Sequence, residues 1–242
     1  MLRYRVPAAT AGMLVLAFIP FGLRLRTSHN TTVRATLAQR APDPAGTATA
    51  APPLRLVVAR TGNEARYRVR EQLAGFDFPN DAVGVTSAIT GAIVIDEQGN
   101  ITPGESRFVV DVTPLKSDQE RRDNYIRRRT LETETHPTVT LAPTAARGLS
   151  LGSAPTGEQS FELVADLTVK GVTRPTTWNV IASFDGDRVT GTAATAFTFE
   201  EFGLAKPRVA RVLSVADTIR LEYDFTLVTD ASAHSASYGG AW

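Results

Sequence analysis

The feature that most constrains the fold is an alternation of apolar side chains at every second position between Phe161 and Val180. Apolar side chains occupy every second position from Phe161 to Val169, and the alternation resumes at Trp178 and Val180. Successive side chains of a β-strand point to opposite faces, so the pattern predicts two strands that each bury one face. Gly171 lies between the two apolar runs and is expected to join the strands.

The same alternation recurs over most of the chain. It is clearest from Ile219 to Leu227, where apolar residues alternate with Arg220, Glu222 and Asp224. Turn signals separate the runs at residues 79–81, 98–100 and 185–187. The apolar faces of the runs include Tyr67, Val69, Ile89, Ile93, Val110, Val139, Trp178, Val180, Phe197, Tyr223 and Phe225.

About eight one-faced strands must hide their apolar faces from water, as either a sandwich or a closed barrel. A barrel of about eight strands is just wide enough to be filled by side chains or to hold one small ligand. Glycines inside two runs, Gly91 and Gly191, are typical of strands that bend at a barrel corner, although a bulge in a flat sheet gives the same pattern. The alternation alone therefore leaves sandwich and barrel open.

A second segment, from Arg121 to Leu141, combines an arginine-rich stretch of helical spacing with His136-Pro137 and a new strand. With Arg122, Asp123, Ile126, Pro137 and the run from Leu167 to Pro175, the order and spacing of the chain resemble the YceI family, the lipocalin-like, polyisoprenoid-binding barrels. The resemblance covers roughly Leu54 to Val228. It implies an all-β, antiparallel, lipocalin-like barrel of about eight strands with a short helical insert.

Two departures from the family pattern concern ligand specificity. Many members carry a histidine in the strand equivalent to Tyr67–Glu71, which has none here. Many also carry an arginine just before an Asp-Phe-Gly motif, where this chain has Glu200 and Glu201 before Phe202-Gly203. The resemblance therefore implies the barrel, with a specificity that differs from that of such members.

The helical insert is expected to begin near Ser117, a residue type suited to cap a helix N-terminus. Its arginines support two interpretations. They could hold an anionic head group such as a diphosphate, for which Arg121, Arg122 and Arg127 are the candidates. They could instead form a solvated basic face with salt bridges to neighbouring carboxylates. The resemblance favours structural roles for Arg122 and Asp123, because the family carries this pair widely.

The chain divides into four parts. Residues 1–27 contain an uncharged apolar stretch, Val6 to Leu23, flanked by arginines, which predicts a signal-anchor or a signal peptide. Residues 28–53 form a linker rich in Ala, Thr and Pro, and residues 54–229 form the YceI-like barrel. Residues 230–242 form a small polar tail that is expected to be disordered. This layout predicts an extracytoplasmic protein of the cell envelope, anchored to the membrane or secreted to the periplasm.

Catalysis finds little support in the sequence. The chain has no cysteine and three histidines, His29, His136 and His234, of which only His136 falls within the predicted barrel. Motifs for a catalytic triad, a metalloprotease, a phosphate loop or a dinucleotide site are missing. The formal net charge of +1 gives no indication of nucleic-acid binding. We therefore expect a non-enzyme without a metal or cofactor.

Two functions remain open. The first is a carrier that holds an apolar chain, such as a polyisoprenoid, quinone or fatty amide, against the inward residues named above. The second is a ligand-free structural or interaction module whose interior is filled by large side chains, among them Tyr67, Trp178 and Phe197. The volume of the barrel interior distinguishes the two, and the sequence does not give that volume.

Overall fold

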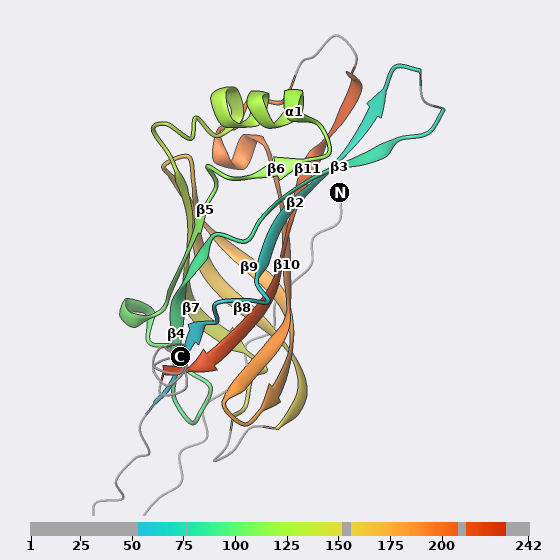
Figure 1. Ribbon diagram of the computed structural model, residues 1–242. Helices are drawn as coiled ribbons and strands as arrows, with labels where there is room; N and C mark the ends of the chain where they lie inside the picture. Colours follow the sequence, from blue (N-terminus) through green and yellow to red (C-terminus); the bar gives the residue numbers. More distant parts are fainter. Residues whose placement is uncertain (1–52, 76, 152–155, 208–211, 231–242) are drawn as a thin grey trace, which may run out of the picture. The chain divides into compact units, whose positions relative to one another are not determined.

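The computed structural model describes residues 53–75, 77–151, 156–207 and 212–230 (Figure 1). The predicted anchor from Val6 to Leu23, nearly all of the linker, and the tail from residue 231 onward lie outside these ranges. Within them, no helix has the length and apolar character needed to cross a membrane.

The described residues form one antiparallel sheet that closes on itself. Its order is β1-β4-β5-β7-β8-β9-β10-β11-β2-β3-β6, with a further pairing between β1 and β11. The strands are β1 (Leu54–Val58), β2 (Glu64–Leu73), β3 (Asn80–Thr86), β4 (Ile89–Ile95), β5 (Arg107–Asp111), β6 (Lys116–Ser117), β7 (Thr138–Arg147), β8 (Gly157–Val169), β9 (Val172–Asp185), β10 (Arg188–Thr198) and β11 (Val212–Thr229).

Three of the barrel strands are interrupted. β1 and β2 both pair with β11, at Val57↔Val228 and Val69↔Ile219, so they are two halves of one barrel strand. β3 and β4 form the next barrel strand, because β2 pairs with β3 and β1 pairs with β4. β5 and β6 form the one after it, because β4 pairs with β5 and β3 pairs with β6. The sheet is therefore a closed antiparallel barrel of eight strands in simple up-and-down order. This confirms the predicted fold class.

The β8–β9 hairpin forms as the sequence predicts. Val169 pairs with Val172 and leaves Lys170 and Gly171 as a two-residue loop, with φ of 49° and 76°. Positive φ at both loop residues is the geometry of a type I′ turn, whose twist matches that of the strands it joins. A glycine adopts it without steric cost, which explains Gly171 at this position.

The predicted corner at Gly91 lies in β4 with φ of 141°. A Cβ atom there would collide with the Arg107 carbonyl oxygen on the neighbouring β5. The pairing of β4 with β5 runs from Ile89↔Val110 to Ala92↔Arg107 without a register shift. Gly91 therefore permits a close approach of two backbones, and an inserted bulge does not fit the register.

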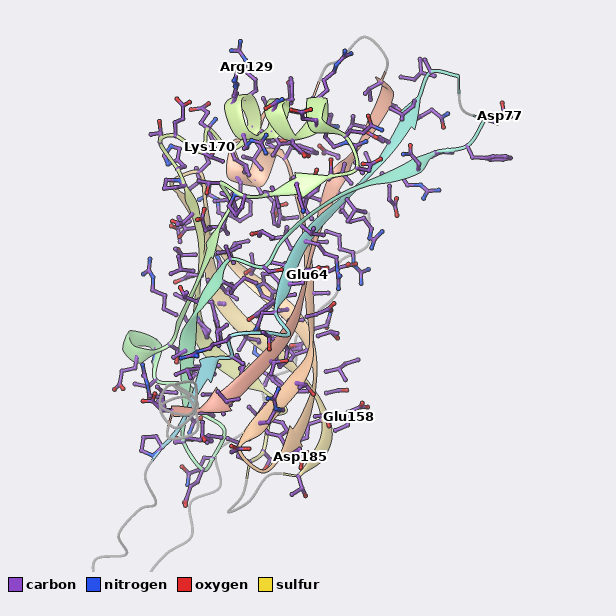
Figure 2. All side chains as sticks on the ribbon, viewed as in Figure 1. Glu64, Asp77, Arg129, Glu158, Lys170 and Asp185 are labelled. Carbon is purple, nitrogen blue, oxygen red and sulfur yellow. The ribbon has the colours of Figure 1, made fainter. Side chains whose placement is uncertain are left out.

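One end of the barrel is covered by a helical segment and the other is packed with side chains. Between β6 and β7 the chain forms α1 (Glu120–Tyr125) and a π-helical turn (Ile126–Thr130), which together are called the lid segment. At the far end Leu149, Leu151, Phe184 and Val189 are buried. Figure 2 shows Lys170 near the lid segment and Asp185 at the far end.

The prediction that Ser117 caps the helix is wrong. Ser117 belongs to β6, and the residue before the helix is Gln119, which makes no side-chain capping bond. The Ser117 backbone N–H and hydroxyl instead donate to Asp123 Oδ1, over 2.8 and 2.7 Å. The Asp123 carboxylate thus fixes the turn into the helix from the C-terminal side, which a capping pattern read along the sequence does not reveal.

Candidate functional site

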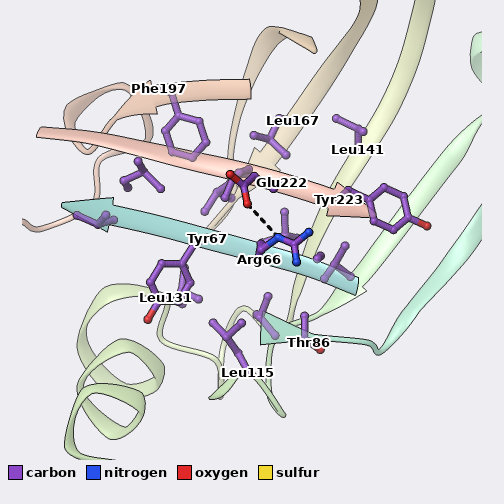
Figure 3. Close-up of a pocket in the computed structure, with 18 of the residues that line it drawn as sticks. Arg66, Tyr67, Thr86, Leu115, Leu131, Leu141, Leu167, Phe197, Glu222 and Tyr223 are labelled. Carbon is purple, nitrogen blue, oxygen red and sulfur yellow. Dashed lines mark hydrogen bonds and ion pairs between the residues drawn. The ribbon is translucent and has the colours of Figure 1, made fainter. Parts of the chain in front are cut away.

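The barrel encloses a cavity of about 1310 Å³. Small-molecule pockets usually measure about 300–1,000 Å³, so this one has room for a larger or longer molecule. Figure 3 shows Leu141, Leu167, Phe197 and Tyr223 around it. The eleven inward residues of the sequence analysis all line it: Tyr67, Val69, Ile89, Ile93, Val110, Val139, Trp178, Val180, Phe197, Tyr223 and Phe225. Their contact with a ligand stays a prediction.

The polar atoms of two aromatic wall residues, Trp178 and Tyr223, are hydrogen-bonded within the wall. Trp178 Nε1 donates to Thr176 Oγ1 over 3.0 Å, and the Tyr223 hydroxyl donates to Asn63 Oδ1 over 2.8 Å. Asn63 is itself buried in the break between β1 and β2. Burial raises the pKa of Tyr223, so its hydroxyl stays neutral. This part of the cavity therefore offers a ligand an apolar surface and few polar partners.

A charged network runs along β2 and β11, on the side of these strands opposite Tyr67 and Tyr223. Arg66 on β2 pairs with Glu222 on β11, and its Nε donates to Glu222 Oε2 over 2.9 Å (Figure 3). Arg68 and Arg220 also pair with Glu222. Arg66 and Glu222 themselves border the cavity, so this ion-paired patch lies between the apolar interior and the solvent.

A buried ion pair joins the lid segment to the barrel. Arg122 Nη2 lies 2.6 Å from Glu71 Oε1, with side chains only 16% and 8% exposed. Burial lowers the pKa of Arg122, but the Glu71 and Asp118 carboxylates outweigh this, and the pKa rises above its ordinary value. Arg122 therefore stays charged and holds the lid segment against β2.

Sequence analysis missed Glu71, although a signal was present. The alternation that turns Tyr67 and Val69 inward also turns Glu71 inward, and a carboxylate on an apolar face needs a buried partner. Two hydroxyls of cavity-lining residues, Tyr67 and Thr130, are buried without a hydrogen-bond partner among the described residues. The lid end of the cavity is therefore its polar end.

A family model for the YceI-like domain matches residues 59–227. The chain belongs to the YceI family. A search of curated proteins finds no match.

One solved structure shows the same fold, and others are more distantly similar. A polyisoprenoid-binding domain from Saccharophagus degradans, implicated in plant cell wall breakdown, is 11% identical with a TM-score of 0.55. The match covers 73% of this chain and 99% of that domain. Burkholderia cenocepacia BcnA is 13% identical with a TM-score of 0.49, over 68% of this chain and 95% of that one. A mutant of the Campylobacter jejuni YceI protein is 12% identical with a TM-score of 0.49, over 61% and 84%.

The arginines of this YceI domain fall into two groups. Arg122 is bound to Glu71 and Asp118, and Arg127 donates to the Leu115 carbonyl oxygen over 3.1 Å. Both support the fold, and Arg127 does not line the cavity.

Arg121, Arg128 and Arg129 form the second group, since they are exposed and line the cavity at the lid end. None of them has a carboxylate within ion-pairing distance in the described part of the chain. Of the three head-group candidates, Arg121 alone is thus both free and at the cavity, and Arg128 and Arg129 are positions that the sequence analysis did not select.

Side chains suited to metal binding are not assembled in the described residues. No group of three His, Cys, Asp or Glu side chains lies close enough there to hold a metal ion. His136 lies beside Gly171 at the β8–β9 turn, outside the cavity wall. His29 and His234 lie outside the described ranges. The arrangement that the described residues do form is an apolar enclosure with a basic, polar end.

Proposed function

We propose that this YceI-family protein is a non-catalytic carrier that encloses one long apolar chain in its barrel. The ligand class is a polyisoprenoid or a molecule of similar shape, such as a quinone tail or a fatty amide. The observation that carries the proposal is the 1310 Å³ cavity lined by inward apolar side chains of the barrel strands. The polyisoprenoid binding named for the Saccharophagus degradans domain of the same fold supports this choice of ligand class.

The cavity can supply enough binding free energy for such a ligand. Removing apolar surface from water contributes about 0.8 kcal/mol for each CH₂ group, or about 4 kcal/mol for an isoprene unit. Association costs about 4–15 kcal/mol, and micromolar affinity requires a net gain of about 8 kcal/mol. A chain of roughly three to six units therefore suffices, provided that the cavity encloses most of it.

The polar end of the ligand is expected at the lid end. Arg121 and Arg128 line the cavity there without a carboxylate partner among the described residues, whereas Trp178 and Tyr223 in the apolar part have their polar atoms bonded. If these arginines contact an anionic head group, a polyprenyl diphosphate binds more tightly than the corresponding polyprenol. Added salt reduces the difference.

The alternative of a ligand-free module with a filled barrel is less well supported. It requires that Tyr67, Trp178, Phe197, Tyr223 and Phe225 occupy the interior between them. They stand instead on the wall around a large cavity.

A location in the cell envelope is part of the proposal. It rests on the apolar stretch from Val6 to Leu23 with arginines on both sides. Cell fractionation with N-terminal sequencing of the mature protein tests it. A membrane-bound chain with an intact N-terminus supports an anchor, whereas a soluble species beginning near Thr27 supports a cleaved signal peptide.

Native mass spectrometry of the full chain purified from its own host, followed by lipid extraction, tests the carrier function. The unsubstituted protein should carry a bound lipid. Leu141→Trp, which fills part of the cavity, should lose it, while Thr140→Trp, one residue away on the outer face of β7, should keep it. A lipid-free mass for the unsubstituted protein, with no saturable binding of polyprenol or polyprenyl diphosphate, would refute the proposal.

A further inference from the structure

Two apolar side chains are strongly exposed at one end of the barrel. Among large hydrophobic residues in the described ranges, Phe78 is 81% exposed, Leu213 67% and Ile181 48%. Phe78 lies at the tip of the β2–β3 hairpin, and Leu213 follows Val212, which pairs with Leu73 at the end of β2. Both elements project at the lid end (Figure 1). Strongly exposed apolar side chains at the same end of a molecule indicate a surface that binds another protein or a membrane.

The cavity continues to the same place. The wall of the cavity extends to the C-terminal end of β2 and to the N-terminal end of β11. It also includes residues that follow the Glu200–Phe202 turn. Ala74 is exposed to solvent, so the cavity reaches the surface there. The residues that carry the wall outward are Leu73, Ala74, Pro207 and Val212. The cavity thus opens at the base of the β2–β3 hairpin, whose tip carries Phe78, and at the start of β11, where Leu213 lies.

The lid segment adds positive charge at this end. Arg121, Arg128 and Arg129 are exposed, and in the described part of the chain no carboxylate pairs with them. Figure 2 shows Arg129 directed away from the barrel. Within the lid segment, residues 120–130, five arginines stand against two carboxylates, Glu120 and Asp123, so the segment carries a net positive charge.

We propose that this mouth rim, made of Phe78, Leu213, Arg121, Arg128 and Arg129, docks on a bilayer surface that contains anionic lipids. Amphipathic aromatic and apolar side chains enter the interfacial layer of a bilayer, and arginines are attracted to anionic head groups. Docking places the cavity mouth against the lipid, so that an apolar chain passes between bilayer and barrel without crossing water.

The inference rests on the proposed function for its purpose, but its geometry is tested separately. It also differs from the N-terminal anchor, because it concerns the orientation of the barrel. A second copy of the chain is the main competing occupant of the rim, since two exposed apolar tips could pack on each other.

Quenching of tryptophan fluorescence by brominated lipid measures the contact directly in the full chain. Phe78→Trp, Leu213→Trp and the control Ile181→Trp each place a tryptophan at an exposed apolar position. The signal of the unsubstituted chain, which contains Trp178 and Trp242, is subtracted. Vesicles contain phosphatidylcholine with or without phosphatidylglycerol. Because quenching is local, an N-terminal segment that also holds the protein on the vesicle does not produce it at residue 78 or 213.

With anionic vesicles, Phe78→Trp and Leu213→Trp should lose intensity and shift their emission to the blue, while Ile181→Trp should change little. Quenching should fall when Arg121, Arg128 and Arg129 are replaced by glutamine. Equal quenching at the three positions, or none at residue 78, would overturn the proposal. So would a blue shift of Phe78→Trp that grows with protein concentration without vesicles, since it would identify an interface between two copies.

A second comparison separates this inference from the carrier function. Leu141→Trp should lose bound lipid but dock normally on vesicles. Because this variant contains an additional tryptophan, its docking is followed with a fluorescent label on the rim and not by tryptophan quenching. Phe78→Ser with Leu213→Ser should retain lipid and dock poorly. Loss of lipid from the rim variant together with unchanged docking would contradict the assignment of the rim to the bilayer.

Discussion

Separating the buried Glu71–Arg122 pair should destabilise the protein far more than removing an exposed arginine nearby. The substitution is Arg122→Met, which keeps an apolar stem of similar length but removes the charge. Glu71, whose side chain is 8% exposed, then loses its ion-pair partner among the described residues. A buried carboxylate without a partner is one of the few causes of large destabilisation by a single substitution.

The magnitude follows from geometry and burial. Two unit charges about 4 Å apart interact by about 4 kcal/mol at an effective dielectric constant of about 20. Removing one member of a buried pair typically costs about 3–5 kcal/mol. In a domain of about 150–250 residues, 1 kcal/mol corresponds to about 2–4 °C in Tm. Arg122→Met should therefore lower the Tm by about 6–20 °C.

Glu71→Gln should cost less, because Arg122 keeps a second partner in Asp118, whose side chain is 69% exposed. The double variant Glu71→Gln with Arg122→Met should be more stable than Arg122→Met alone, since it buries no unpaired charge. Arg121→Met, on the same helix and exposed, serves as the control and should change the free energy of unfolding by less than about 0.5 kcal/mol.

Thermal unfolding followed by circular dichroism at neutral pH measures all four variants. The reasoning is refuted if Arg122→Met melts within about 2 °C of the unsubstituted protein, which corresponds to less than about 1 kcal/mol. It is also refuted if the two single effects simply add in the double variant, because coupling between contacting partners must appear as non-additivity.

Three further predictions concern the wall of the barrel. Burial raises the pKa of Glu222, but Arg68 and its neighbouring arginines outweigh this and hold it below its ordinary 4.5. The stabilisation from these ion pairs is therefore fully present above about pH 4.5 and is lost as the pH falls through the lower folded value. Unfolding titrations between about pH 3 and 7 should show a shallower acid-side loss of stability for Glu222→Gln. Phe225→Asp places a charge in the apolar cavity wall and should lower the free energy of unfolding in urea by about 3 kcal/mol or more. Asp224→Ala, on the outer face, should lower it by about 1 kcal/mol or less. Equal losses would mean that the faces are reversed. Gly91→Ala should destabilise or block folding, because its Cβ meets the backbone of β5 at a φ that disfavours alanine; a wild-type melting curve would show that this approach is not tight.

The sequence by itself determined the strands and their faces. Period-2 alternation is a local property, since side-chain direction follows from backbone geometry within each strand. It therefore placed Tyr67, Trp178 and Phe225 on the inner wall and Glu222 outside before any fold was known. The loop at Gly171 was also predictable, because the residue that permits its geometry lies within the loop.

Choosing the barrel over a sandwich required more than local pattern. Closure depends on β11 pairing with the first barrel strand, and these segments lie at opposite ends of the domain. A sandwich and a barrel both bury one face of each strand, so the alternation is the same for either fold. The choice between them therefore rests on the family resemblance. The predicted helix start at Ser117 is wrong because residue type alone does not decide which bond a side chain makes. Ser117 is a residue type that caps helices, but its hydroxyl donates to the Asp123 carboxylate.

Tertiary structure alone decided whether the interior is hollow and which arginines are free. A cavity volume is the small difference between the space that all eight barrel strands enclose and the side chains that fill it, so no single segment encodes it. Arg122 and Arg121 look equivalent in sequence. Arg122 forms an ion pair with Glu71 on β2, whereas Arg121 lines the mouth of the cavity. The difference arises because the fold brings together groups that lie far apart in the chain.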